Sequence, residues 1–161
     1  MKYIKKFEVK KGVSDYDTLV DMLFDSIYFG NVKSVLDLID ENPELVNITN
    51  SSYEDDSPLL LAINRERYEI AEKLVKLGAN INYQSEGGET PLMVAGGVGD
   101  VNSYDIITML IESGADWNIK DLDGDDFLHY LTEEDEEKVI EDYPEKYEDY
   151  LLKKKEEKYN I

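Results

Sequence analysis

The sequence predicts an all-α repeat protein, and three observations support this prediction. A Ser-Pro or Thr-Pro pair begins an apolar segment at Ser57 and again at Thr90, 33 residues later. A second apolar segment then ends at Gly78 and at Gly114, 36 residues apart. A related segment begins at Asp126, 36 residues after Thr90. Recurrence with this period is typical of stacked helical repeats, in which each unit needs its neighbours to bury its apolar face.

The first unit is degenerate and covers about residues 14–49. Ser14 is a suitable cap for a helix over 16–27, which carries an apolar stripe. Residues 28–32 match the turn into a second helix, whose apolar residues also recur at helical spacing. A segment that contains Pro43 then replaces the glycine found at the end of the later units.

The second and third units have clear helix ends. Pro58 and Pro91 occupy the first helical position, where a missing N–H costs nothing, and the Ser or Thr before each can cap the helix. Gly78 and Gly114 follow a helix end, where a left-handed residue is favoured. The third unit has three extra residues around 100–104, which are either an added contact or a tolerated loop insertion.

The last unit is partial, and a capping segment over 132–161 follows it. Asp126 can cap a helix there, although Phe127 replaces the usual proline. Thr132 begins a new helix in a pattern close to a capping box, and Pro144 ends that helix. A final charged helix over 145–159 is expected to turn Tyr147, Tyr150, Leu151 and the stem of Lys154 inward.

These segments resemble the ankyrin repeat family. Its T-P-L-H-x-A pattern is matched by 57–62 and 90–95, and its G-A-D-x-N pattern by 78–82 and 114–118. The resemblance implies an all-α ankyrin-repeat solenoid of about four helix pairs with hairpin fingers and a helical C-terminal cap. The implied divisions are a basic N-terminal extension (1–13), the repeats (14–131, divided into 14–49, 50–82, 83–118 and a partial 119–131) and the cap (132–161).

Charge narrows the class of partner. The chain has 161 residues with 17 Lys plus Arg and 37 Asp plus Glu, a net charge of -20. Residues 12–142 alone carry -24, residues 1–11 carry +4, and residues 143–161 are neutral. Phosphate backbones and anionic lipid surfaces repel so acidic a chain, so we expect neither nucleic acid nor membrane as a partner. Without an apolar run of membrane or signal-peptide length, we expect a cytoplasmic protein. We also expect it to be monomeric when free.

Ankyrin proteins usually bind their partners in a concave groove between the fingers and the first helices, so the resemblance also implies a binding surface here. The residues expected on it are Tyr53, Glu54, Asp56, Asn64, Arg65, Tyr83, Glu86, Glu89, Val98, Tyr104, Leu122, Asp123, Asp125, Glu133 and Glu134. This set holds eight acids and one base, and Tyr53, Tyr83, Val98 and Tyr104 are its possible apolar anchors. The acids serve either to attract a basic protein or only to keep the domain soluble.

Other kinds of site are disfavoured. The chain has no Cys and one His, which excludes sulfur-based zinc sites and multi-histidine metal sites. Residues 121–126 resemble the start of a calcium loop, but Gly is fourth and the twelfth residue is Thr132. Residues 96–99 lack the Lys-Ser/Thr of a phosphate loop. His129 stands at the family's histidine position, which implies hydrogen bonds between neighbouring turns, and Trp117 stands at an apolar position, which implies packing.

We therefore expect no enzyme, cofactor or metal site, but a protein-binding module with a basic protein partner. Small acidic ankyrin proteins resemble bacterial immunity proteins, which neutralise a toxin such as a nuclease. The alternative is a general adaptor or host-directed protein that recruits its partner without inhibiting it. A neighbouring gene for a basic toxin, or co-purification with a nuclease, would distinguish the two.

Overall fold

A computed structural model describes residues 15–99 and 103–159, and the regular structure in these ranges is helical. The α-helices are α1 (Asp15–Tyr28), α2 (Val32–Glu41), α3 (Pro58–Asn64), α4 (Tyr68–Lys76), α5 (Pro91–Val98), α6 (Ser103–Glu112), α7 (Glu133–Asp142) and α8 (Pro144–Tyr159). Three short 3-10 helices lie between them, η1 (Pro43–Asn47), η2 (Ser51–Tyr53) and η3 (Phe127–Tyr130). The prediction of an all-α solenoid is confirmed. Ser14 and residues 1–13 lie outside the described residues.

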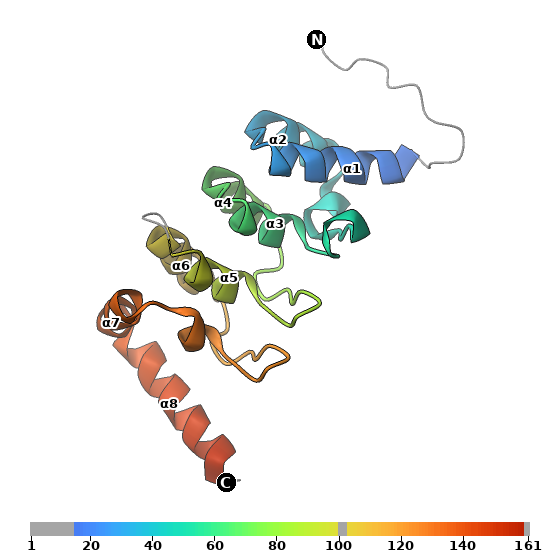
Figure 1. Cartoon of the computed structure of the whole chain (residues 1–161). Helices are drawn as coiled ribbons and strands as arrows, with labels where there is room; N and C mark the ends of the chain where they lie inside the picture. Colours follow the sequence, from blue (N-terminus) through green and yellow to red (C-terminus); the bar gives the residue numbers. More distant parts are fainter. Residues whose placement is uncertain (1–14, 100–102, 160–161) are drawn as a thin grey trace.

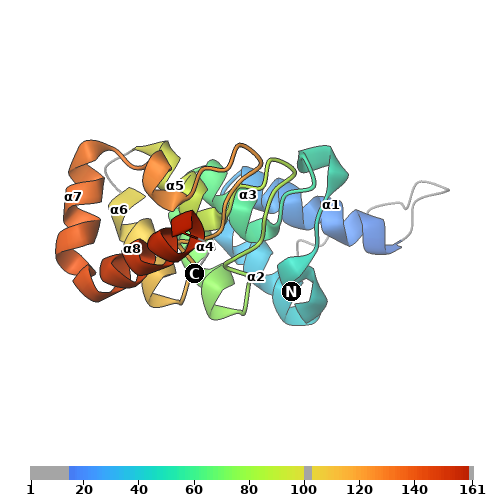
Figure 2. The ribbon, with the colours of Figure 1, turned by 90° about the horizontal axis from the view of Figure 1, so that it is seen from below.

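The helices of the first three units form two rows. α1, α3 and α5 lie in one row and α2, α4 and α6 in the other, and the hairpin fingers project beside the first row (Figures 1 and 2). α7 and α8 follow at the end opposite α1, and α8 crosses the end of the stack (Figure 2). This order places the fingers and the first row on one side of the molecule.

The helix ends form as their sequences predict. Ser57 and Thr90 each accept a hydrogen bond from the backbone N–H three residues later, at 3.2 and 3.3 Å, and a proline follows each of them. Gly78 and Gly114 have φ angles of 91° and 94°, in the left-handed region that a side chain disfavours. These local signals fix the register of the second and third units.

The third unit is three residues longer than the second, and the extra length is divided between its two helices and the connection that joins them. α5 has 8 residues where α3 has 7, and α6 has 10 where α4 has 9. The connection 99–102 is one residue longer than the connection 65–67. Residues 100–102, the middle of the expected insertion, lie outside the described residues. The surplus therefore lengthens both helices as well as the turn.

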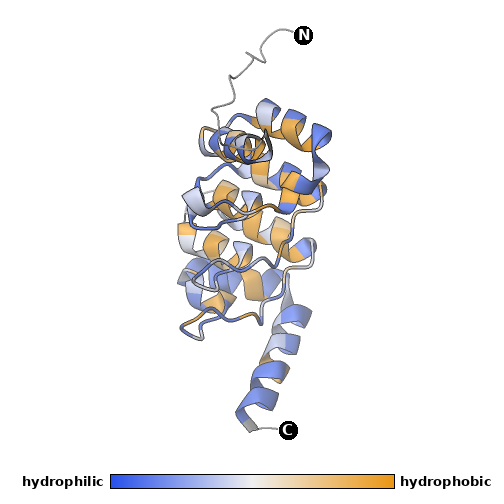
Figure 3. Ribbon diagram, turned by 90° about the vertical axis from the view of Figure 1, so that its right-hand side faces the viewer, coloured by the Kyte–Doolittle hydropathy of each residue, from blue (hydrophilic) through white to orange (hydrophobic). Residues whose placement is uncertain are grey.

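The apolar core runs through all units as one cluster. Its fully buried side chains include Phe24, Ile27, Leu59, Ile63, Leu74, Leu92, Leu110 and Phe127. Apolar ribbon segments gather between the helix rows, whereas α8 is largely polar (Figure 3). Because each unit packs on the next, truncation of one core side chain destabilises more than one unit.

The fourth unit begins differently from the expectation. Asp126 makes no side-chain capping bond, so the predicted cap is wrong, and η3 is a single 3-10 turn. Asp126 is only 5% exposed, and its carboxylate accepts a hydrogen bond from the Tyr150 hydroxyl at 3.0 Å. Lys154 also pairs with it at 3.1 Å. Its carboxylate therefore holds α8 against the stack instead of capping η3.

The last two helices agree with their predicted ends. Thr132 accepts a hydrogen bond from the Asp135 N–H at 3.1 Å, and Pro144 starts α8 directly after α7. Tyr150 is buried, as expected, but Leu151 is 44% exposed, so its assignment to the inner face is wrong. One residue along a helix turns the side chain by about 100°, which carries Leu151 away from the face of Tyr150.

Two single residues were assigned structural roles from the family pattern. Trp117 is 3% exposed and packs edge-on against Phe127, with ring centroids 5.7 Å apart, so its packed role is confirmed. The predicted role of His129, hydrogen bonding between neighbouring turns, is wrong. Its side chain is 68% exposed, and its Nε2 lies 3.4 Å from the carboxylate of Asp125, four residues earlier. Where a 3-10 turn replaces an α-helix, the side chains point differently, and this histidine does not join neighbouring turns.

The second and third fingers meet at Gly88. The N–H of Leu122 donates to the Gly87 carbonyl at 3.0 Å. Gly88 has a φ of 84°, and a Cβ there would lie 2.9 Å from both the Asp121 Cα and the Leu122 nitrogen. Only glycine therefore fits between the two hairpins.

Gly88→Ala is expected to separate these fingers. The added Cβ meets backbone atoms and must adopt a left-handed φ, a combination that costs about 1–3 kcal/mol. Amide hydrogen exchange at Leu122 should become about tenfold faster or more. Gly87→Ala is the control, because the nearest atom to its Cβ is 3.5 Å away on the flexible Glu89 side chain. Equal rates of amide exchange at Leu122 in the two variants would contradict the close approach of the third finger to Gly88.

Candidate protein-binding surface

Carboxylates gather on the fingers and on the exposed side of α1, a region called the acidic surface below. The fingers span 50–56, 83–89 and 121–125, and a bridge or a backbone hydrogen bond closes each hairpin. The carboxylates of the acidic surface are Asp21, Asp25, Glu54, Asp55, Glu86, Glu89, Asp121, Asp123 and Asp125. The parallel stacking of the units places these groups in succession along one side of the molecule.

Adjacent fingers share their electrostatic field. Burial is the largest cause of the raised pKa of Asp56 on the first finger and of Tyr130, which follows the third finger. Glu89 on the second finger adds to both shifts. Asp55 and Asp56 of the first finger, together with Glu86, raise the pKa of Tyr83, although burial contributes most to that shift. The charges on the fingers therefore act as one group and not as three separate clusters.

Asp56 is buried within the first finger and not exposed as expected. It is 7% exposed, and burial raises its pKa to about 6. A hydrogen bond with Asn64 and the charge of Arg65 oppose the shift, while Glu54 and Glu89 add to it. The antiparallel bridge between Asn50 and Asp56 closes the first finger and turns Asp56 inward. Its expected place on the surface is therefore taken by its neighbours Glu54 and Asp55.

Tyrosines stand between the acids. The Tyr53 hydroxyl donates to Asp25 on α1 at 2.7 Å, and burial and this bond raise its pKa to about 12. The Tyr83 hydroxyl donates to the Asp55 carbonyl on the finger before it. Tyr130 donates to Asp121, which lowers the pKa of that carboxyl. Each of these hydroxyls is engaged within the chain, so only the half-buried rings are available to a partner.

The one base expected on this surface, Arg65, is exposed but stacks on a ring of the first unit. The guanidinium carbon of Arg65 lies 4.3 Å from the ring centroid of Tyr28. Arg67, in the same turn, donates to the Tyr28 carbonyl at 3.1 Å and so caps the end of α1. Both arginines therefore contact the first unit, and within residues 15–99 and 103–159 neither forms an ion pair with a finger carboxylate.

Two groups of expected residues lie elsewhere. Tyr104 is on α6, in the second row, and its hydroxyl donates to Asp142 of α7 at 2.7 Å, so this tyrosine joins two units instead of facing the fingers. Glu133 and Glu134 are exposed at the start of α7, where Glu134 pairs with Lys138 at 2.8 Å.

The remaining expected residues lie on or near the acidic surface. Leu122 is 79% exposed at the third finger, beside Asp123, which is also exposed. Glu54 and Glu86 are exposed, whereas Glu89 and Asp125 are half-buried. Val98 is half-buried at the end of α5.

Five residues of this region are not among those expected from the sequence. One of them is Asp55, on the first finger. Asp21 and Asp25 on α1 lie next to the first finger, where they accept hydrogen bonds from Asn50 and Tyr53. Their spacing of four residues on one helix face was the available signal. Asp121 and Tyr130 form the corresponding pair beside the third finger, and no local pattern predicts that contact.

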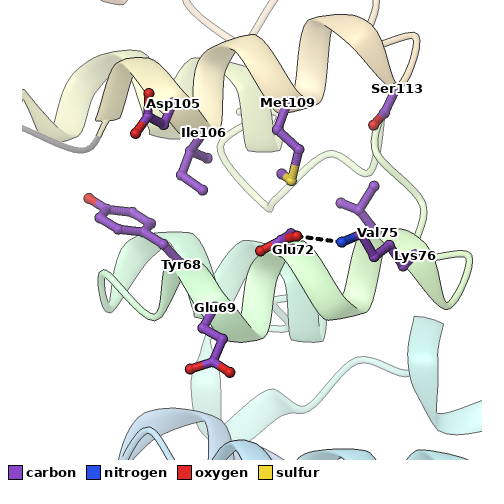
Figure 4. A pocket seen from close by; sticks show the side chains of 9 residues that line it. All are labelled: Tyr68, Glu69, Glu72, Val75, Lys76, Asp105, Ile106, Met109 and Ser113. Atoms are coloured by element: carbon purple, nitrogen blue, oxygen red, sulfur yellow. Dashed lines mark hydrogen bonds and ion pairs between the residues drawn. The ribbon is translucent and has the colours of Figure 1, made fainter.

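A separate hollow lies on the second row, between α4 and α6. Tyr68 and Glu72 of α4 face Ile106 and Met109 of α6, while Glu69 points away (Figure 4). Glu72 is paired with Lys76 along its own helix. This hollow is formed by second helices and is distinct from the acidic surface.

Neither a metal cluster nor a membrane-spanning helix is present among the described residues. Over residues 15–99 and 103–159, no cluster of three or more His, Cys, Asp or Glu side chains is arranged to hold a metal ion. None of the helices in those ranges has the length and apolarity needed to cross a membrane.

Comparison with known proteins agrees with the observed stack. The family model for ankyrin repeats, in three copies, matches residues 23–121. The human transient receptor potential cation channel subfamily A member 1 is 32% identical over 91 residues, which make up 56% of this chain and 8% of the channel. The chain thus spans a small part of that relative's length. Ankyrin repeats indicate a protein–protein interaction module and are generally not enzymatic. The chain belongs to the ankyrin repeat family.

Proposed function

We propose that this protein binds a basic protein through the acidic surface. The observation that carries the proposal is the grouping of finger and α1 carboxylates on one side, while Arg65 and Arg67 are turned onto Tyr28. A surface with one sign of charge attracts an oppositely charged partner from a distance and rejects others.

Affinity also requires apolar contact. Leu122, which is 79% exposed on the third finger, can supply one anchor in the middle of the acids. The half-buried rings of Tyr53 and Tyr83 are further flat surfaces at which a Lys or Arg side chain can pack. The proposed partner therefore presents a basic surface with an apolar pocket.

Inhibition of a toxin such as a nuclease is the specific form of this proposal. A nuclease binds the phosphates of its substrate with Lys and Arg, and a row of carboxylates offers the same charge to those side chains. Recruitment without inhibition is the alternative. Titration of the captured partner's own activity decides between them, because an inhibitor abolishes that activity at one equivalent and an adaptor leaves it unchanged.

The proposal is tested by charge reversal with a matched control. Glu86, Glu89, Asp123 and Asp125 are changed to Lys together, which alters only the second and third fingers. The control changes Asp40, Glu41, Glu44 and Glu112 to Lys, which gives the same net charge from exposed acids outside the acidic surface. The partner is first captured on the wild-type protein at low salt and eluted at high salt.

The finger variant should associate with the purified partner about 10–100-fold more slowly, with a weaker dependence on salt. The control should change the association rate much less. Equal slowing by both variants would show that only net charge matters. Capture of a partner that is itself acidic would overturn the proposal.

A further inference from the structure

One face of α8 has no partner in the described structure. The opposite face is held to the stack by Tyr150, by Lys154 on Asp126 and by Glu157, which pairs with Lys120 at 2.6 Å. The outer face carries Leu151, 44% exposed, and Leu152, 58% exposed. These two adjacent leucines form a small apolar patch on a helix that is otherwise largely polar.

The leucines lie in the centre of a charge pattern. Glu148 and Lys155, seven residues apart, are on the same face of the helix, one on each side of the leucines. Over residues 15–99 and 103–159, neither Glu148 nor Lys155 is in an ion pair. A shallow hollow runs along this side, lined by Glu148, Leu151, Leu152, Lys154, Lys155 and Lys158.

We propose that α8 is the contact of a symmetric dimer, in which the α8 helices of two copies pack antiparallel on their outer faces. A two-fold axis between positions 151 and 152 brings the four leucines together. The same axis places Glu148 of each copy opposite Lys155 of the other. The face is therefore complementary to itself, with one ion pair on each side of an apolar centre.

This charge pattern selects one geometry. In a parallel pair, Glu148 would face Glu148 and Lys155 would face Lys155, and both contacts are repulsive. Only the antiparallel arrangement pairs opposite charges at both ends of the leucine cluster. The charge pattern thus specifies that the partner is a second α8 helix and that the two helices run antiparallel.

Local neutrality permits the contact in an acidic protein. Residues 143–161 have no net charge, whereas residues 12–142 carry -24. α8 lies at the end of the stack opposite α1 (Figure 1), so a second copy joined there meets the neutral segment of the chain. The expectation that the protein is monomeric when free stays a prediction, and this proposal is its alternative.

The dimer is expected to be weak. A helix of 16 residues is about 24 Å long, and one such pair buries less than a stable interface usually requires. We expect a dissociation constant of roughly 10–500 µM at moderate ionic strength. The inference is independent of what binds the acidic surface.

Sedimentation equilibrium of the full chain, from roughly 10 µM to 1 mM, tests the dimer. Leu151→Ala with Leu152→Ala should abolish it. Glu148→Lys and Lys155→Glu should each weaken it about tenfold or more, because each places two like charges together. Circular dichroism checks that the variants keep their helix content.

Charge exchange makes the test specific to the antiparallel geometry. The double variant Glu148→Lys with Lys155→Glu should dimerise like the wild type. An equimolar mixture of the two single variants should dimerise better than either alone, because every pair in the mixed dimer is attractive. A wild type that stays monomeric at the highest concentration overturns the proposal. So do single variants that dimerise normally, or a double variant that fails to recover.

Discussion

Leu74→Ala should lower the free energy of unfolding by about 2–5 kcal/mol and the melting temperature by roughly 5–15 °C. Leu74 is fully buried on α4 and belongs to the cluster that joins the second unit to its neighbours. Its truncation leaves a cavity that the flanking helices fill only in part, and the loss is transmitted to the adjoining units. Thermal and urea unfolding followed by circular dichroism provide the measurement.

Leu77→Ala is the matched control. Leu77 follows α4 directly and is 46% exposed, so the same truncation there removes little buried surface. We expect a change within about 0.5 kcal/mol. Equal melting temperatures for Leu74→Ala and Leu77→Ala would contradict the burial of Leu74 between the units.

Asp56→Asn should stabilise the protein at neutral pH by about 2–3 kcal/mol. The pKa of Asp56 is raised from 3.8 to about 6, so the folded state holds this proton more tightly than the unfolded state. Below pH 3.8 the raised pKa carries no penalty. As the pH rises from 3.8 to about 6, the unfolded chain ionises first and the fold loses stability. Above that range the penalty is constant, and an amide at position 56 removes it.

The measurement is the difference in unfolding free energy between Asp56→Asn and the wild type at several pH values from 4 to 7. The difference should be near zero at the acid end and grow with pH. Glu86→Gln removes a carboxylate from an exposed position on the next finger and serves as the control, with little change expected across the range. A constant difference for Asp56→Asn would show that its carboxyl is not the group responsible.

Local chemistry explains which parts of the fold the sequence predicts well. Helix starts at Ser57 and Thr90 and glycine ends at Gly78 and Gly114 depend on residues within one or two turns. The start of α7 at Thr132 is of the same kind. In each case the side chain that decides the structure is adjacent to the backbone group it satisfies.

The errors arise where a side chain meets a distant segment. Asp126 is held by Tyr150, 24 residues later. Tyr104 is bonded to a residue 38 positions away. Such contacts depend on how units stack, and position within a repeat does not reveal them. The composition of the acidic surface was therefore more predictable than its individual contact residues.

The fluorescence of Trp117 reports on the packing at the C-terminal end of the stack alone. It is the single tryptophan of the chain, buried against Phe127 and near Tyr143 where the third unit meets the C-terminal helices. Its fluorescence follows that junction, while circular dichroism averages over the whole chain. If the linear array frays from α1, the fluorescence transition lags behind the loss of helix, and if it frays from α8, the fluorescence changes first. Comparing the two signals thus gives the direction in which the stack comes apart.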